Sequence, residues 1–165
     1  MFAAARNLIG SIKPWWDLFV RITQAFYPLA DLVLRLYVAR VFMLSGYSKI
    51  SDWSSTLDLF HNEYHVPLLN PTFAAYLATA GELGLSSLLA LGVGTRFAAA
   101  GLSVLNITAV LSYYDTLKTV PGALQDHLQW GLMLFMLLTL NISVTRADYY
   151  LNRFFQDWLS GSSET

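Results

Sequence analysis

The chain alternates long apolar stretches with shorter polar connections, and four of these stretches are long enough to cross a membrane. A helix that spans the hydrocarbon core of a bilayer takes about 20 mainly apolar residues. The four stretches cover about residues 29–50, 72–93, 97–114 and 128–144. The first is the least apolar, because it contains Asp31, Arg35 and Arg40. The pattern predicts an all-α integral membrane protein with four spanning helices.

A different pattern precedes the first span. Over residues 14–27, apolar and polar positions repeat with the period of an α-helix. The apolar face consists of Trp15, Leu18, Ile22 and Phe26, and the polar face of Asp17, Arg21 and Gln24. This predicts an N-terminal amphipathic helix lying on the cytoplasmic leaflet; the alternative is a cytoplasmic extension of the first span. We expect the segment to be retained, because residues 13–17 interrupt the only early apolar run of a signal-peptide pattern.

The basic residues of the connections indicate the orientation of the chain. Those before the first span, between the second and third, and after the fourth are Arg6, Lys13, Arg21, Arg96, Arg146 and Arg153. The other two connections are mainly acidic, with only Lys49 and Lys118 as basic residues. Lysine and arginine concentrate on the cytoplasmic side of membrane proteins. Both termini and the turn at 94–96 are therefore expected in the cytoplasm.

The spans divide the chain into three parts. These are an amphipathic segment at 1–28, a four-helix transmembrane domain at 29–145 and a cytoplasmic tail at 146–165. Residues 160–165 are predicted to be disordered. Small residues, which let membrane helices approach closely, cluster in the second and third spans. They are Ala74, Ala75, Ala78, Ala80, Gly81 and Gly84, followed by Ala98, Ala99, Ala100 and Gly101. We therefore expect a tight four-helix bundle.

Composition narrows the classes of function. Charged residues make up 13% of the chain and hydrophobic ones 55%, against about 25% charged in soluble domains. The net charge of −1 lacks the basic excess that nucleic-acid binding requires. There is no cysteine, so any thiol chemistry or thiol-bound metal belongs to a partner. The sequence contains no nucleophile elbow, phosphate-binding loop or dinucleotide fingerprint, which argues against a self-contained enzyme.

Charged residues within the spans are the first candidates for function, because an ionisable group inside a bilayer is costly unless paired or hydrated. Arg40 and Glu82 each lie ten positions from the cytoplasmic end of a span, at a depth of roughly 15 Å. We expect them to form a buried ion pair, with Arg35 bonded to Asp31 one turn earlier. Either the pair only fixes helix registry, or Arg35, Arg40 and Glu82 line a pocket for a quinone headgroup or a proton path.

A second set of polar residues gathers at the outer ends of the spans. Its members are Tyr47, Lys49, Asp126, His127 and Trp130. Antiparallel packing would bring them to the periplasmic surface, where tyrosine and tryptophan are typical of an interfacial belt. Lys49, Asp126 and His127 together could also donate to a carbonyl or shuttle a proton.

Two histidines in the first outer loop, His61 and His65, have the spacing that would place them on one helix face. With Glu63 or His127 they could bind copper or zinc, which imidazole suits. The alternative is a solvated or lipid-facing loop helix. Haem is not expected, because His127 is the only histidine next to a span.

Five short stretches follow one another with a characteristic spacing. They are Leu34-Arg35-Leu36, Ser45-Gly46-Tyr47-Ser48-Lys49-Ile50, Val66-Pro67, Gly81-Glu82-Leu83-Gly84 and Gly92-Val93-Gly94-Thr95-Arg96-Phe97-Ala98-Ala99. Together, over about residues 29–145, they resemble the DoxX family of small bacterial inner-membrane proteins. Arg40 departs from that pattern, since DoxX proteins more often carry a small or apolar residue there.

The resemblance implies a four-helix fold in the bacterial inner membrane. Some DoxX members are linked to thiosulfate:quinone oxidoreductase or to membrane redox complexes. Residues 52–67 and 124–127 look most like the DoxX members encoded beside copper-responsive modified-peptide clusters.

The leading hypothesis is a quinone-binding membrane subunit of an oxidoreductase system, whose partner protein carries out the substrate chemistry. The partner would belong to a redox or peptide-processing system. The alternatives are a noncatalytic anchor or assembly subunit and a copper-handling membrane protein. A homo-oligomer is also considered. Nucleic acid is not an expected partner.

Overall fold

The computed structural model describes residues 2–140 and 143–161, and the regular structure in these ranges is entirely helical. The helices are α1 (Phe2–Ala25), α2 (Tyr27–Ser51), α3 (Trp53–Asn62), α4 (Pro71–Leu91), α5 (Thr95–Ser112), α6 (Tyr114–Leu117), α7 (Ala123–Thr139) and α8 (Ala147–Gly161). The all-α prediction is therefore confirmed for the described part of the chain.

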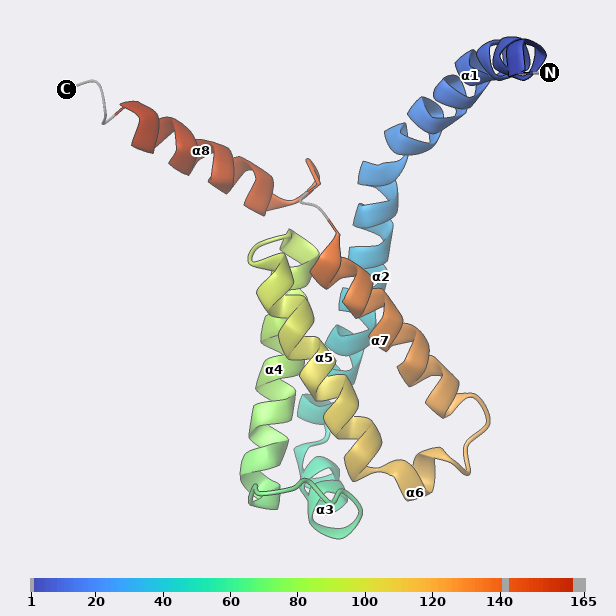
Figure 1. The fold of residues 1–165 in the computed structure, drawn as a ribbon. Helices are drawn as coiled ribbons and strands as arrows, with labels where there is room; N and C mark the ends of the chain where they lie inside the picture. Colours follow the sequence, from blue (N-terminus) through green and yellow to red (C-terminus); the bar gives the residue numbers. More distant parts are fainter. Residues whose placement is uncertain (1, 141–142, 162–165) are drawn as a thin grey trace.

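Four long helices form the body of the molecule. Helix α2 packs against α4, α4 against α5, α5 against α7, and α7 against α2 (Figure 1). Their shared core consists of Val38, Ala39, Phe42, Leu89, Ala98, Ala99, Leu102, Leu134 and Leu137. By length and apolar composition, α4 and α5 qualify as membrane spans among the described residues. Helix α7 has 17 residues, and α2 contains several charges.

Close approach of these helices depends on particular glycines. A Cβ on Gly46 would lie 2.8 Å from Leu83 Cγ, and a Cβ on Gly101 would lie 2.6 Å from Leu85 Cδ1. The prediction that small residues bring the second and third spans together thus holds for Gly101 and also for Gly81, which faces Leu105. Gly84 does not take part, because nothing lies within 4 Å of a Cβ built there.

The ends of α4 follow from local chemistry. Asn70 caps the helix by accepting a hydrogen bond from the backbone N–H of Thr72, and Pro71 occupies the first turn, where its missing N–H costs nothing. Gly92 ends the helix in the left-handed conformation, with φ of 73°. The span predicted for 72–93 therefore ends at Leu91.

The fourth span begins and ends earlier than the predicted 128–144. Gly122, in the left-handed conformation, precedes α7, and Leu140 leaves it with an extended backbone. The polar run from Gln125 to His127 is thus helical. The segment after the helix folds back onto the bundle, where Ser143 and Arg146 are buried.

Helices α1 and α8 project from one end of the bundle, and α3 and α6 lie at the other (Figure 1). Helix α1 is not a continuous extension of α2, because a turn at Phe26 and Pro28 in the first turn of α2 separate them. The predicted disorder is wrong at Ser160 and Gly161, which belong to α8. The rest of that prediction, residues 162–165, lies outside the described residues.

Candidate functional site

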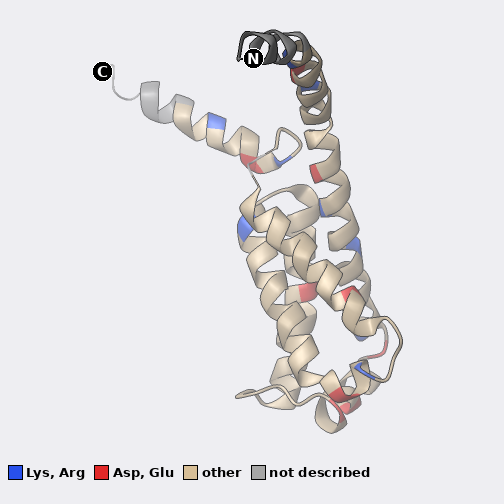
Figure 2. Cartoon of the chain, turned by 45° about the vertical axis from the view of Figure 1, so that its right-hand side comes forward, with Lys and Arg blue, Asp and Glu red and all other residues tan. Residues whose placement is uncertain are grey.

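Charged positions are sparse along the body of the bundle (Figure 2). One partly buried ion pair lies toward the end that carries α3. Lys49 of α2 donates from Nζ to both carboxylate oxygens of Glu82 on α4, at 2.9 and 2.8 Å. The side chains are 14% and 12% exposed, and Lys49 Nζ also reaches Ser45 Oγ at 2.9 Å. Lys49 is therefore held in place by partners on two helices.

The predicted partner of Glu82 is wrong. Arg40 is exposed in a shallow groove beside Leu36, Met43 and Ala90. Ala90 is two turns of α4 away from Glu82. The residue of α2 that faces Glu82 is Gly46, because a Cβ there would lie 3.1 Å from the Cβ of Glu82. The register of α2 against α4 thus brings Lys49 to Glu82 and leaves Arg40 near the other end of α4.

The Lys49–Glu82 pair lies at the edge of a cavity of about 190 Å³ between α4 and α5. Apolar side chains make most of its wall, including Phe60, Val66, Ala74, Ala78, Leu105 and Ala109. The polar groups that line it besides the pair are Tyr64, Thr108 and Ser112. A mainly apolar pocket with a few polar groups is the usual form of a small-molecule site.

Two of these polar side chains contribute hydroxyl groups to the wall of the cavity. Ser112 is 3% exposed, and its hydroxyl has no hydrogen-bond partner among the described residues. Tyr64 belongs to the loop between α3 and α4, and burial, with a smaller effect of the Glu82 charge, raises its pKa to about 12. Tyr64 therefore keeps its proton at neutral pH and remains a hydroxyl donor.

A stack of three aromatic rings lies at the α3 end of the cavity, and two of them, Phe60 and Tyr64, line it. The ring of Tyr64 lies parallel to Phe60 on one side and Tyr113 on the other, with centroid distances of 4.8 and 4.6 Å. Tyr113 donates its hydroxyl proton to Glu63 Oε2 at 2.7 Å, and His65 N–H donates to the carbonyl of Ser112 at 3.0 Å. These contacts join the α3–α4 loop to the end of α5. The hydrogen bond to Glu63 is the main cause of a raised pKa of Tyr113.

The residues predicted to gather at the outer ends of the spans do not form one cluster in the structure. Tyr47 is 61% exposed and Asp126 is exposed. Lys49 lines the cavity, whereas His127 lines a separate groove between α5 and α7. The grouping of Lys49, Asp126 and His127 in one site is therefore wrong, because their helices face different neighbours. Trp130 packs edge-on against His127, with 4.9 Å between ring centroids.

His127 is oriented by Asn106, a buried residue that the sequence pattern did not single out. Asn106 Nδ2 donates to the carbonyl of His127 at 2.9 Å, so the amide oxygen faces the ring and lies 2.7 Å from Nδ1. Nδ1 must then carry the proton, since a carbonyl oxygen only accepts. This leaves Nε2 of the neutral ring as the acceptor.

The two loop histidines do not share a helix face. Helix α3 ends at Asn62, so His61 lies in its last turn and His65 lies beyond it. His61 Nε2 is 3.0 Å from Thr72 Oγ1. Among the described residues, no group of three or more histidine and acidic side chains has the arrangement of a metal site.

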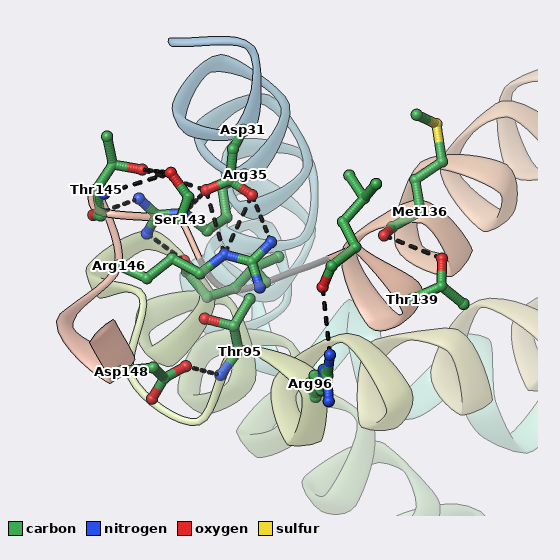
Figure 3. Close-up of polar contacts among 12 residues, drawn as sticks. Asp31, Arg35, Thr95, Arg96, Met136, Thr139, Ser143, Thr145, Arg146 and Asp148 are labelled. Carbon is green, nitrogen blue, oxygen red and sulfur yellow. Dashed lines mark hydrogen bonds and ion pairs between the residues drawn. The ribbon is translucent and has the colours of Figure 1, made fainter. Parts of the chain in front are cut away.

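A second cluster of buried charges lies at the opposite end of the bundle (Figure 3). The expected pair is present, with Arg35 Nε 3.6 Å from Asp31 Oδ2. Arg146, assigned to the cytoplasmic tail from sequence, donates to Asp31 from Nε at 3.1 Å and also from Nη2. All three side chains are at most 1% exposed. Nothing in the sequence around Arg146 indicates that it is buried.

The same cluster ties the segment after α7 to the α4–α5 turn. Arg35 donates to the carbonyls of Leu89, Ala90 and Thr145 at 3.0, 2.8 and 3.0 Å. Asp148 accepts from the backbone N–H groups of Gly94 and Thr95, at 2.7 and 2.8 Å, and so caps α5. The charges at this end therefore hold chain segments together, whereas the Lys49–Glu82 pair faces a cavity.

The comparisons with known proteins give one match. The family model described as DoxX matches residues 30–115. The matched part includes most of α2, all of α3 to α5 and both members of the Lys49–Glu82 pair. No curated protein and no solved structure matches the chain.

Proposed function

The chain belongs to the DoxX family and is a membrane protein of that type, and from this we propose that it is the membrane subunit of a quinone-linked redox system acting with a partner protein. In this proposal α2, α4, α5 and α7 cross the bacterial inner membrane as a four-helix bundle. Both termini face the cytoplasm, in keeping with the basic residues at that end. Helix α1 lies along the cytoplasmic surface on its apolar face.

The observation that carries the proposal is the Lys49–Glu82 pair beside an apolar cavity. A quinone headgroup is a flat, mainly apolar ring with carbonyl acceptors, and its reduced form has hydroxyl donors. Lys49 offers a cation that donates to a carbonyl, and Glu82 offers a carboxylate that accepts from a hydroxyl. The donor set, the orphan hydroxyl of Ser112 and the apolar walls fit such a group.

The chain's own residues would bind the ring and handle protons. A bound quinone would supply the exchange of two electrons and two protons with the partner's substrate chemistry. Lys49 would hold one polar edge of the ring, while Tyr64 and Ser112 would donate hydrogen bonds from the outer side. Glu82 would accept or release a proton at Oε1 or Oε2 beside the Lys49 ammonium.

The cavity also has a route for a lipid-soluble ligand. Leu77 of α4 and Val104 of α5 line the cavity and are 50% and 62% exposed. In a membrane-embedded bundle these side chains face lipid. A ligand with an apolar tail could therefore enter sideways between α4 and α5, with its tail remaining in the bilayer.

Mass spectrometry of an organic extract from the full chain, purified in mild detergent, tests the proposal. Wild type should carry nearly stoichiometric quinone, and Glu82→Gln should lose it. Arg40→Leu is the matched control, because it removes a charge of α2 that lies away from the cavity. Its quinone content should equal that of wild type.

A double variant separates binding from folding. Lys49→Met with Glu82→Leu removes both charges and leaves neither one buried without a partner, so the protein should stay folded. Loss of quinone from this folded variant supports the proposal. Absence of quinone from every sample, or equal quinone in all of them, overturns it and favours an anchoring or assembly subunit.

A further inference from the structure

We propose that α8 lies flat in the membrane surface at the α4–α5 turn, with its apolar stripe inserted into the lipid. The stripe consists of Tyr150, Leu151, Phe154 and Phe155, which are 63%, 44%, 64% and 56% exposed. This spacing places the four side chains on one face of the helix. The proposal concerns a surface distinct from the Lys49–Glu82 cavity.

The opposite face of α8 is polar. Asn152, Arg153 and Gln156 are exposed there. Beyond the first turn, no hydrogen bond or ion pair joins α8 to the rest of the described chain. The apolar stripe is thus about half exposed, although four large side chains in one stripe are costly to leave in water.

The first turn of α8 is fixed to the bundle. Asp148 accepts two hydrogen bonds from the start of α5, and its own N–H donates to the carbonyl of Gly92 at 3.0 Å. Arg146, just before the helix, is buried against Asp31. The helix therefore leaves the body of the protein at the end of two apolar helices, α4 and α5, where a membrane boundary is expected.

Lipid is the occupant that the rest of the structure favours. Helix α1 leaves the bundle at the same end as α8, and both helices point away from the bundle (Figure 1). It too exposes large apolar side chains, with Trp15 and Phe19 at 73% and 56%. Two helices with exposed aromatic residues at one end suit the interface of a bilayer, where aromatic rings with a polar edge concentrate.

The absence of cysteine from the chain makes the test direct. Single cysteines are placed at Leu151 and Phe154 on the stripe, and at Asn152 and Gln156 on the polar face as matched controls. Each is given a nitroxide label in the full-length protein, reconstituted into vesicles of phosphatidylethanolamine and phosphatidylglycerol. Collision of the label with oxygen, which partitions into lipid, is compared with collision with a water-soluble nickel chelate.

We expect oxygen to dominate at Leu151 and Phe154, and the nickel chelate to dominate at Asn152 and Gln156. Strong nickel access at all four positions would place α8 in water and overturn the proposal. Poor access of both agents at Leu151 and Phe154 would also overturn it, because protein would then cover the stripe. Neither result bears on quinone content, so this proposal fails or stands independently of the proposed function.

Discussion

The buried and partly buried charged side chains form two clusters, one toward each end of the helical bundle. Lys49 and Glu82 pair beside a cavity, whereas Asp31, Arg35 and Arg146 pair where three chain segments meet. A charge in the interior of a membrane-embedded bundle is costly unless a partner or water compensates it. Each cluster therefore makes its members interdependent, and removal of one member should cost more than removal of a whole pair.

The Lys49–Glu82 pair provides a quantitative test of this interdependence. Glu82→Gln leaves the partly buried Lys49 ammonium without a counter-charge and should lower the free energy of unfolding, by less than the about 3–5 kcal/mol that breaking a fully buried pair costs. Lys49→Met with Glu82→Leu should recover most of that loss. Thermal unfolding in detergent measures both variants. Equal destabilisation by the single and double variants would contradict an energetic coupling between the two side chains.

Gly92 is constrained both by its backbone and by its neighbours. Its φ is 73°, and a Cβ there would lie 2.7 Å from Arg35 Nη1 and 2.8 Å from Arg146 Cα. Gly94 is the matched control, because its φ is 56° but nothing lies within 4 Å of an added Cβ. Gly94→Ala should therefore cost roughly 1–2 kcal/mol for the backbone alone. Gly92→Ala should cost clearly more, as measured by thermal unfolding; similar losses would mean that the turn adapts without strain.

At the level of helices, the capping contacts fix where each helix begins and ends. Helix α4 is bounded by Asn70 and Gly92, which local sequence signals identify. Helix α5 is capped by Asp148, which lies far along the chain and has no such local signal. The capping contact also sets the direction in which α8 leaves the bundle. One side chain thus links the start of α5 to the first turn of α8.

Asp148→Ala should show both consequences. Loss of the cap should destabilise the protein by about 1 kcal/mol. It should also free the first turn of α8, so that a nitroxide on a cysteine at Phe154 gives a more mobile spectrum. Asn152→Ala, on the exposed polar face of α8, is the control and should change neither quantity. An unchanged spectrum in Asp148→Ala would mean that Arg146 and the backbone hydrogen bond from residue 148 to Gly92 are enough to hold α8 in place.

At the scale of the whole molecule, the bundle has one end closed by loops and another from which two helices diverge. Helix α3 and the following loop cover the cavity at the first end. Helices α1 and α8 leave the second end (Figure 1). In the proposed orientation the cavity lies toward the periplasmic side, and the diverging helices lie at the cytoplasmic surface.

The orientation can be tested with single cysteines at exposed positions of the two ends. Thr119→Cys lies in the α6–α7 connection, and Asn152→Cys lies in α8. A membrane-impermeant maleimide should label Thr119→Cys in intact spheroplasts, and should label Asn152→Cys only after permeabilisation. The reverse pattern would invert the topology.

Patterns along the chain are enough to predict the helical class, the approximate places of the long apolar helices, the Asp31–Arg35 pair and the DoxX resemblance. These depend on composition and on spacing within one helix, which are local properties. Contacts between distant segments are what pair Glu82 with Lys49, bury Arg146 and orient His127 through Asn106. Counting residues from a predicted membrane boundary assumes that adjacent helices are in matched register. Here the register of α2 against α4 depends on Gly46 fitting against Leu83. The burial of Arg146 depends on its contact with Asp31. Both contacts join residues far apart in the sequence.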